Sequence, residues 1–239
     1  MKRAYLMEMN VLRGYATSLL ATGLLVTVLV GVGMKTAIVA PAVLTSMCLM
    51  MGAIGSSVYD DQNGWGSYRL TLPVSKRDVV LSRYAAIATL GLIGSAVGFA
   101  ASLAVMGLAS AVELPGGLSE LLAFSGERVA GMAFATAACV LIGSTVASVV
   151  TPVYFKFGQT KATQLLPTVT VGLFVVAPML LGNSGILGGG AFGLVAGLLT
   201  FAETPVGLAA SMAALLAASL LMLAASAAVS LGLYGRREL

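Results

Sequence analysis

Histidine is absent from this sequence of 239 residues. Its absence excludes Ser-His and Cys-His catalytic sites, zinc sites of the His-Glu-x-x-His type and proton relays through imidazole. Only two cysteines occur, Cys48 and Cys139, and both lie deep inside uncharged runs. We expect them to be small buried apolar residues rather than a disulfide or a metal site. The sequence therefore predicts no catalytic residue, no cofactor site and no metal site in this chain.

Charged residues are also scarce, at 9% of the chain, whereas soluble domains contain about 25%. Hydrophobic residues make up 59%, and mean hydropathy is +1.00. A helix needs about 20 apolar residues to cross a membrane, and several uncharged runs reach that length. We therefore expect an all-α polytopic membrane protein, a single transmembrane domain over residues 1–239 surrounded by membrane lipid. The net charge of +4 marks membrane sidedness rather than a nucleic-acid partner.

The uncharged runs predict six transmembrane helices, at about residues 16–34, 37–58, 84–109, 129–150, 162–181 and 206–233. Before the first of them, Leu6, Met9 and Leu12 recur at helical spacing among charged residues. This pattern predicts a short amphipathic helix over residues 1–15 that lies in the headgroup region.

Basic residues predict which side of the membrane each loop occupies. The N-terminus, residues 59–83, residues 151–161 and the C-terminal tail hold 11 of the 13 Lys and Arg residues. Because such residues accumulate on the cytoplasmic side, we expect both termini there. The uncharged tract 162–202 must then cross the membrane once. We expect its remainder, over about residues 183–205, to form a re-entrant or surface hairpin on the outer side.

The longest polar interval is residues 59–83, which holds seven of the 22 charged residues. Pro73 favours an extended Leu72. Ser75 can cap a helix, with Asp78 as the acidic half of a capping box, and this helix would continue into the third span. Upstream, the acidic pair Asp60 and Asp61 either binds a cation of the interval, Arg69 or Lys76, or is solvated. The charges would equally suit a basic loop that only fixes topology.

This interval resembles a segment of the permease subunits of ABC-2-type exporters, most closely their small six-span bacterial branch. The resemblance is carried by the acidic pair after the second span, a turn with an aromatic residue and glycines, and LTLPVSKRDVVLSRY before the third span. In that family the segment reads as an acidic residue followed by Leu-Pro-Val-Ser-Arg-x-x-Ile/Val. Here Lys76 and Arg77 stand where one basic residue is usual.

The resemblance implies a half-transporter in the bacterial cytoplasmic membrane that pairs with a second permease, identical or related. Each permease would engage a separate cytoplasmic ATPase, which holds ATP and Mg²⁺. Residues 59–83 would be the coupling segment, supported by Asp60, Asp61 and Arg69. The residues expected to contact the ATPase are Leu72, Pro73, Val74, Ser75, Lys76, Arg77 and Asp78.

Two features of the residues themselves bear on this interpretation. The chain has no G-x-x-x-x-G-K-S/T phosphate-binding loop, so energy from ATP would have to come from a partner. The predicted spans contain no acidic or basic residue that would point to an ion pathway. Their Ala, Gly, Ser, Thr, Leu and Val residues would suit an amphipathic or hydrophobic cargo such as a peptide, a lipid or a drug, and they would equally suit plain helix packing.

Other interpretations stay open from the sequence. The substrate-capturing membrane subunits of ECF-type importers are also small and free of ATPase motifs, and an accessory or immunity membrane protein would have a similar composition. Residues 182–185 spell G-x-S-G, the nucleophile motif of rhomboid-type proteases. Those enzymes need a histidine base, which this chain lacks.

Overall fold

The computed structural model describes residues 2–34, 36–62, 74–111, 122–158, 165, 168–170, 172 and 204–235. These ranges contain no strand. Their long helices are α1 (Lys2–Gly33), α2 (Ala40–Gln62), α4 (Lys76–Ala111), α6 (Gly126–Phe157) and α9 (Pro205–Gly235). Each of the five is long and apolar enough to cross a membrane. The all-α, polytopic class that the sequence predicts is therefore confirmed.

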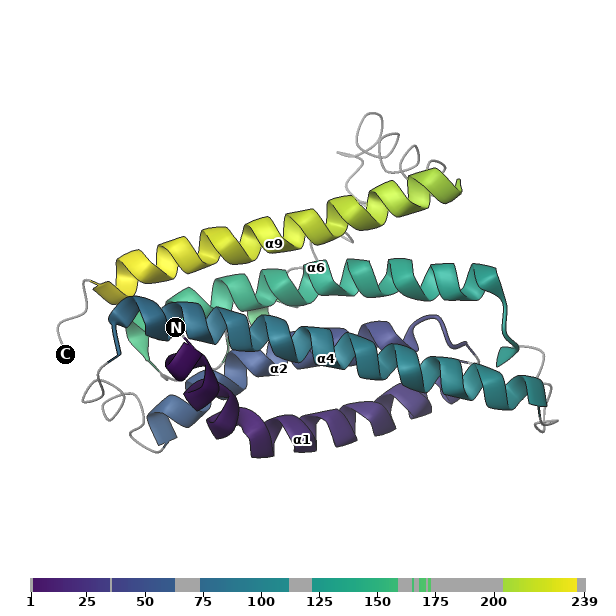
Figure 1. Ribbon diagram of the computed structural model, residues 1–239, viewed down its shortest axis with the longest axis horizontal. Coiled ribbons are helices and arrows are strands. Elements are labelled where there is room, and N and C mark those ends of the chain that lie inside the picture. Colours follow the sequence, from purple (N-terminus) through teal and green to yellow (C-terminus); the bar gives the residue numbers. More distant parts are fainter. Residues whose placement is uncertain are drawn as a thin grey trace.

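The five helices lie lengthwise beside one another (Figure 1). Residues from all of them meet at one end, where Arg83 of α4 contacts Glu8 of α1, Asp60 of α2 and Phe155 of α6, and Phe155 contacts Tyr234 of α9. We call this the basic end. It contains the starts of α1 and α4 and the final turns of α2, α6 and α9. Neighbours α6 and α9 consequently run parallel.

Helix α2 occupies the centre, where it packs on α1, α4 and α6. Helix α4 contacts α2 through a Gly94-x-x-x-Gly98 motif. A Cβ on Gly98 would lie 2.9 Å from Pro41 Cα, and one on Gly94 would lie 2.6 Å from Cys48 Sγ. Because only glycine fits at these distances, the motif brings the two helix backbones close together.

The N-terminal segment corrects one prediction. Residues 2–15 do not form a helix of their own, because they continue into the first span as α1, whose dark purple first part is turned relative to the rest (Figure 1). Leu6 is 49% exposed, whereas Glu8, Leu12 and Ala16 are buried. The buried face therefore follows these residues at a spacing of four, and it packs on the other helices.

The predicted basic loop 151–161 is a second correction, because α6 continues to Phe157, with Pro152 inside it. Proline lacks the amide hydrogen that would bond the carbonyl of Ser148, four residues earlier. Ser226 of α9 supplies the missing donor, since its hydroxyl lies 2.7 Å from the Ser148 carbonyl oxygen. A hydrogen bond between helices thus allows α6 to pass through its proline.

The start of α9 is fixed by a cap. The amide of Gly207 donates to Thr204 Oγ1 at 3.0 Å, and Pro205 takes the first helical position, where its missing amide hydrogen has no helical partner to lose. The predicted sixth span is confirmed as a helix. The predicted fifth span, 162–181, lies outside the described residues except for a few isolated positions, and so does the predicted hairpin 183–205 up to the start of this cap.

Candidate functional site at the basic end

The predicted coupling segment includes the first turn of α4. The amide of Asp78 donates to Ser75 Oγ at 3.1 Å, and the amide of Val79 donates to the Ser75 carbonyl at 3.1 Å. Ser75 is therefore the cap that the sequence predicts. The side chains of Ser75, Lys76 and Arg77 are exposed, so this turn presents two cations on a fixed backbone.

This exposed turn is attached directly to the core. The next residues of α4, Val79 and Val80, are buried with Tyr84, Phe155 and Tyr234 in one apolar cluster that joins α4, α6 and α9. Val74, on the other side of the cap, packs against the same cluster. The turn is therefore held from both sides, and a partner that displaced it would also displace α4.

Seven residues after Lys76, Arg83 binds two carboxylates from different helices. Its Nε lies 3.2 Å from Glu8 Oε1 of α1, and its Nη2 donates to Asp60 Oδ2 of α2. We call Glu8, Asp60 and Arg83 the Arg83 cluster. The Arg83 and Glu8 side chains are each only 3% exposed, and that of Asp60 is 18% exposed. One guanidinium group therefore joins three helices in an interior with little access to water.

The surroundings of the cluster compensate for the burial of charge. A buried ion is costly unless it is paired, and a guanidinium group can form directed bonds to two carboxylates at once. The Phe155 ring of α6 lies 5.1 Å from the Arg83 guanidinium carbon, a distance that gives a cation–π contact. Tyr15 of α1 and Tyr59 of α2 pack edge to face, with ring centroids 5.9 Å apart, and add an aromatic contact between these two helices. The cluster therefore connects α1, α2 and α4 through ion pairs and packs against α6.

Directly after Arg83, Tyr84 extends the polar connection to α9. Its hydroxyl lies 2.6 Å from Ser226 Oγ and 2.8 Å from Ser230 Oγ. Because Ser226 uses its single hydrogen on the Ser148 carbonyl, Tyr84 must donate to Ser226, and Ser230 must donate to Tyr84. The hydrogen bonds therefore run in one direction, from Ser230 through Tyr84 and Ser226 to Ser148, and tie α4, α9 and α6 together.

The predicted site residues divide into three groups. Val74 to Asp78 lie together in and beside the first turn of α4. Leu72, Pro73 and Arg69 lie outside the described residues, as does the side chain of Asp61. Asp60 pairs with Arg83, which is neither of the two cations, Arg69 and Lys76, that the sequence suggests for it.

Sequence reasoning missed the roles of Glu8 and Arg83. The available signal was helical spacing, because Glu8 lies one turn before Leu12 on the buried face of α1. A carboxylate on such a face needs a cationic partner, and Arg83 stands at the boundary of an apolar span.

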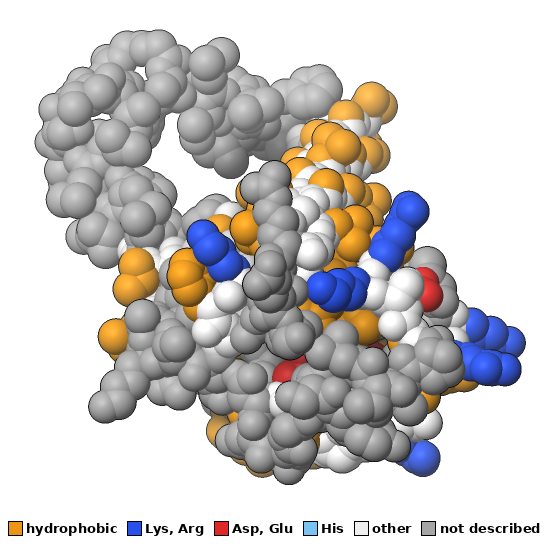
Figure 2. All heavy atoms as spheres, turned by 90° about the vertical axis from the view of Figure 1, so that its left-hand side faces the viewer, with side chains coloured by type: hydrophobic (Ala, Val, Ile, Leu, Met, Phe, Trp, Pro, Cys, Tyr) orange, Lys and Arg blue, Asp and Glu red, His pale blue; other side chains and the backbone are white. Residues whose placement is uncertain are grey.

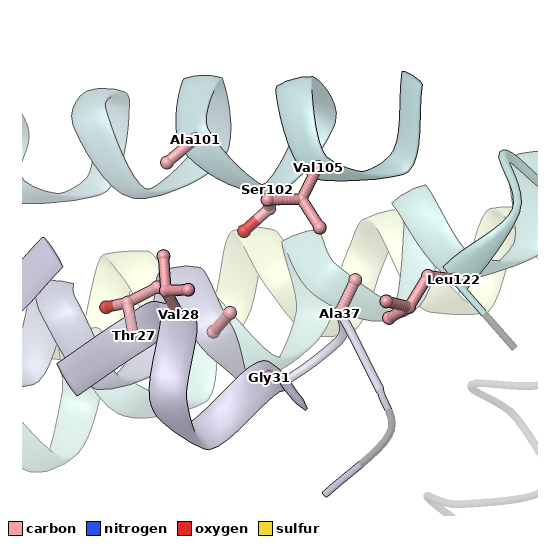
Figure 3. Close-up of a pocket in the computed structure, with 9 residues that line it drawn as sticks. Thr27, Val28, Gly31, Ala37, Ala101, Ser102, Val105 and Leu122 are labelled. Atoms are coloured by element: carbon pink, nitrogen blue, oxygen red, sulfur yellow. The ribbon is translucent and has the colours of Figure 1, made fainter. Parts of the chain in front are cut away.

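Two cavities lie elsewhere in the bundle. A small one of about 30 Å³, enough for about one water molecule, lies between α1 and α4. Figure 3 shows Ser102 directed from α4 toward the part of α1 that carries Thr27 and Val28. The hydroxyls of Thr27 and Ser102 are buried and have no hydrogen-bond partner within the described ranges.

The larger cavity, about 670 Å³, is a cleft between α4, α6 and α9, with Leu49 of α2 also in its lining. We call it the apolar cleft. Leu92 and Phe99 of α4, Ala133 of α6 and Leu220 of α9 are typical of its walls. Among the described residues no charged side chain lines it, and the polar contribution comes from serine and threonine hydroxyls.

Comparison with known proteins gives one match. The family model described as ABC-2 family transporter protein matches residues 11–235. This range includes all of the five long helices except the first turns of α1. No curated protein and no solved structure matches the chain. The match agrees with the resemblance of residues 59–83, and it extends over nearly the whole sequence. The chain therefore belongs to the ABC-2 transporter family, as a multi-pass membrane permease.

Proposed function

We propose that this chain is the transmembrane permease subunit of an ATP-driven exporter in a bacterial cytoplasmic membrane. Membrane components of the ABC-2 family generally work with an ABC ATPase. In this proposal the ATPase is a separate cytoplasmic subunit that holds ATP and Mg²⁺, and the chain has no ATPase site of its own. A second permease, identical or related, completes the transporter.

The observation that carries this proposal is the exposed, capped first turn of α4. It presents Lys76 and Arg77 at the end of a helix of 36 residues whose next turn is buried against α6 and α9. Such a turn suits a docking contact in which charges set orientation and apolar neighbours supply affinity. Leu72, Pro73, Val74, Ser75 and Asp78 complete the proposed coupling surface.

Charge gives the orientation of the bundle. Figure 2 looks onto the basic end, where Lys and Arg side chains stand around the described surface. Because cationic residues accumulate on the cytoplasmic side, this end faces the cytoplasm, with both termini and the coupling segment.

The parallel pair α6 and α9 supports a total of six spans. The former ends at the basic end and the latter begins at the opposite end. In the proposed topology the chain between them crosses the membrane once. Residues 162–181 are the proposed fifth of six spans, which leaves about residues 183–205 on the outer side.

The apolar cleft supports a hydrophobic or amphipathic cargo, such as a peptide, a lipid or a drug. Its volume of about 670 Å³ lies within the range of about 300–1,000 Å³ that small-molecule sites occupy. Its wall of apolar side chains and hydroxyls would accept hydrocarbon and neutral polar groups, and the described lining has no charge to bind an ion.

The test of the proposal is charge reversal on the exposed turn. The full chain is purified from its native membrane, and the ATPase that co-purifies with it is identified and used for reconstitution. Lys76→Glu with Arg77→Glu should abolish ATPase binding and transport while membrane insertion stays normal. Lys156→Glu, at the end of α6, is the matched control and should bind the ATPase normally. Normal transport by the double variant at normal expression would overturn the proposed docking role.

A further inference from the structure

We propose that Arg83 is the positioning residue that carries a displacement of the coupling turn into α1 and α2. The inference rests on the proposed function, because it requires an ATPase that acts on the first turn of α4. It adds the route by which the movement spreads: from the turn along α4 to Arg83, and from Arg83 through Glu8 and Asp60 to two further helices.

The first step is transmission along α4. Lys76 and Arg83 are seven residues apart in one unbroken helix, which corresponds to roughly 10 Å along its axis. The backbone hydrogen bonds of a helix resist compression, so this part of α4 moves as a unit. The buried residues Val79 and Val80 keep it packed against α6 and α9. A movement of the turn therefore reaches Arg83 as a movement of the whole segment.

The second step concerns α2. Asp60 and Arg83 stand near the two ends of the polar interval 59–83, and their ion pair joins the end of α2 to α4 across that interval. The glycine contact of α2 with α4 lies further along the bundle, so this pair is a contact that joins the two helices at the end where the force acts. With it, α2 must follow α4.

The third step concerns α1. Glu8 lies in the first part of α1, which is turned relative to the rest of the helix (Figure 1). Arg83 Nε holds its carboxylate at 3.2 Å, and Tyr5 reaches Thr89 of α4 with its hydroxyl at 3.0 Å. These bonds couple the first part of α1 to α4.

The use of ion pairs, rather than apolar contacts, to connect these helices also supports a positioning role for Arg83. A buried ion pair is weak evidence for stability, because well-packed apolar residues can hold helices together equally well. What the guanidinium group adds is direction, since its planar fork fixes the angle at which two carboxylates approach. A joint that must keep three helices in one relative geometry during a movement needs this directional constraint.

The decisive experiment separates ATPase binding from transport. The full chain and its co-purified ATPase are reconstituted in proteoliposomes, and ATPase affinity, ATP hydrolysis and cargo transport are measured together. Glu8→Gln removes one carboxylate charge and leaves Arg83 paired with Asp60. We expect its ATPase affinity to stay within about twofold and its transport per ATP hydrolysed to fall at least about fivefold, the lower end of typical coupling between sites.

Three further variants complete the design. Glu8→Asp keeps the charge and should restore part of the transport per ATP. Arg83→Lys keeps the positive charge but lacks the planar guanidinium group. It should therefore bind the ATPase normally but transport cargo poorly. Glu127→Gln, a carboxylate change at the opposite end of the bundle, is the matched control and should leave all three quantities unchanged.

Each result decides between the two proposals. Unchanged transport per ATP in Glu8→Gln, with ATPase binding lost in the Lys76/Arg77 reversal, would overturn the role of Arg83 and leave the proposed function standing. Loss of ATPase binding in Glu8→Gln would also overturn it, because the cluster would then belong to the docking surface. If no variant and no wild-type chain binds an ATPase, the proposed function itself is wrong. If Glu8→Gln does not fold, Glu8→Asp and Arg83→Lys provide the same comparison.

Discussion

Ser226 of α9 donates a hydrogen bond of 2.7 Å to the carbonyl oxygen of Ser148, the acceptor that Pro152 leaves without a helical partner in α6. An unpaired carbonyl in a membrane interior is costly, so the proline of one helix and the serine of another should be energetically coupled. Pro152 and Ser226 are 74 positions apart in the sequence, and a double-mutant cycle directly measures the energetic coupling between them.

In that cycle we expect Ser226→Ala to lower the free energy of unfolding by about 1 kcal/mol. In a Pro152→Ala background the loss should be smaller, because the new amide of residue 152 can bond the Ser148 carbonyl. Reversible unfolding in mixed micelles measures both values. Ser211→Ala, which removes a hydroxyl bonded within its own helix, is the control. Equal losses in the two backgrounds would show that the residues are independent.

The contact between α2 and α4 predicts opposite effects for two glycines of one helix. A Cβ on Gly98 would meet the Pro41 backbone, which cannot move aside easily, so Gly98→Ala should cost about 1–3 kcal/mol. A Cβ on Gly107 has nothing within 4 Å, so Gly107→Ala should be neutral or stabilise by about 0.5–1 kcal/mol. Thermal unfolding in detergent compares the two variants, and a stable Gly98→Ala protein would argue against the close packing.

Removal of the cation from the Arg83 cluster should lower the free energy of unfolding far more than removal of an exposed cation. Arg83→Gln leaves the buried Glu8 without its ion pair to Arg83, and breaking such a pair costs about 3–5 kcal/mol. Arg77→Gln, on the exposed turn, should stay within about 0.5 kcal/mol. Yield of folded protein and unfolding in denaturant would show the difference. Similar stability of the two variants would contradict the burial of the cluster.

The proposed orientation predicts the sides from which two positions can be labelled. In a background with Cys48→Ala and Cys139→Ala, Arg77→Cys should react with a membrane-impermeant maleimide only from the cytoplasmic side. Glu127→Cys, at the start of α6, should react only from the outside. Labelling of whole cells and of inverted vesicles distinguishes the sides, and the reverse pattern would overturn the orientation.

The apolar cleft predicts that a larger side chain will interfere with cargo at one position of α4 and not at another. Ala96 lines the cleft, so Ala96→Phe should reduce transport by occupying part of its volume. Ala104 is exposed on the same helix, eight residues further on, and Ala104→Phe should transport normally. ATPase binding should be unchanged in both. Equal transport by the two variants would indicate that cargo does not enter the cleft.

Composition and hydrophobic run length predict the helical class and the approximate positions of the five described helices, because a membrane imposes both properties on the chain. The Ser75 cap could be predicted too, because its chemistry is local. The Arg83 cluster could not be. Its members come from three segments far apart in the sequence, and charge alone does not identify Arg83 among the cations that could pair with Asp60.

The extension of α6 through Pro152 was unpredictable for a related reason. A proline near a polar segment normally indicates the end of a helix, and the donor that compensates for it, Ser226, lies in a helix that follows much later. Tertiary structure overrides the local preference here, whereas at Thr204 and Pro205 the local preference is followed.

The parallel arrangement of α6 and α9 has a consequence for biogenesis. Two helices that run parallel cannot form a simple hairpin, and α9 follows α6 in the sequence, so α6 is synthesised before the helix that completes its packing. Until α9 has been made, the Ser148 carbonyl lacks the donor that Ser226 supplies in the finished bundle.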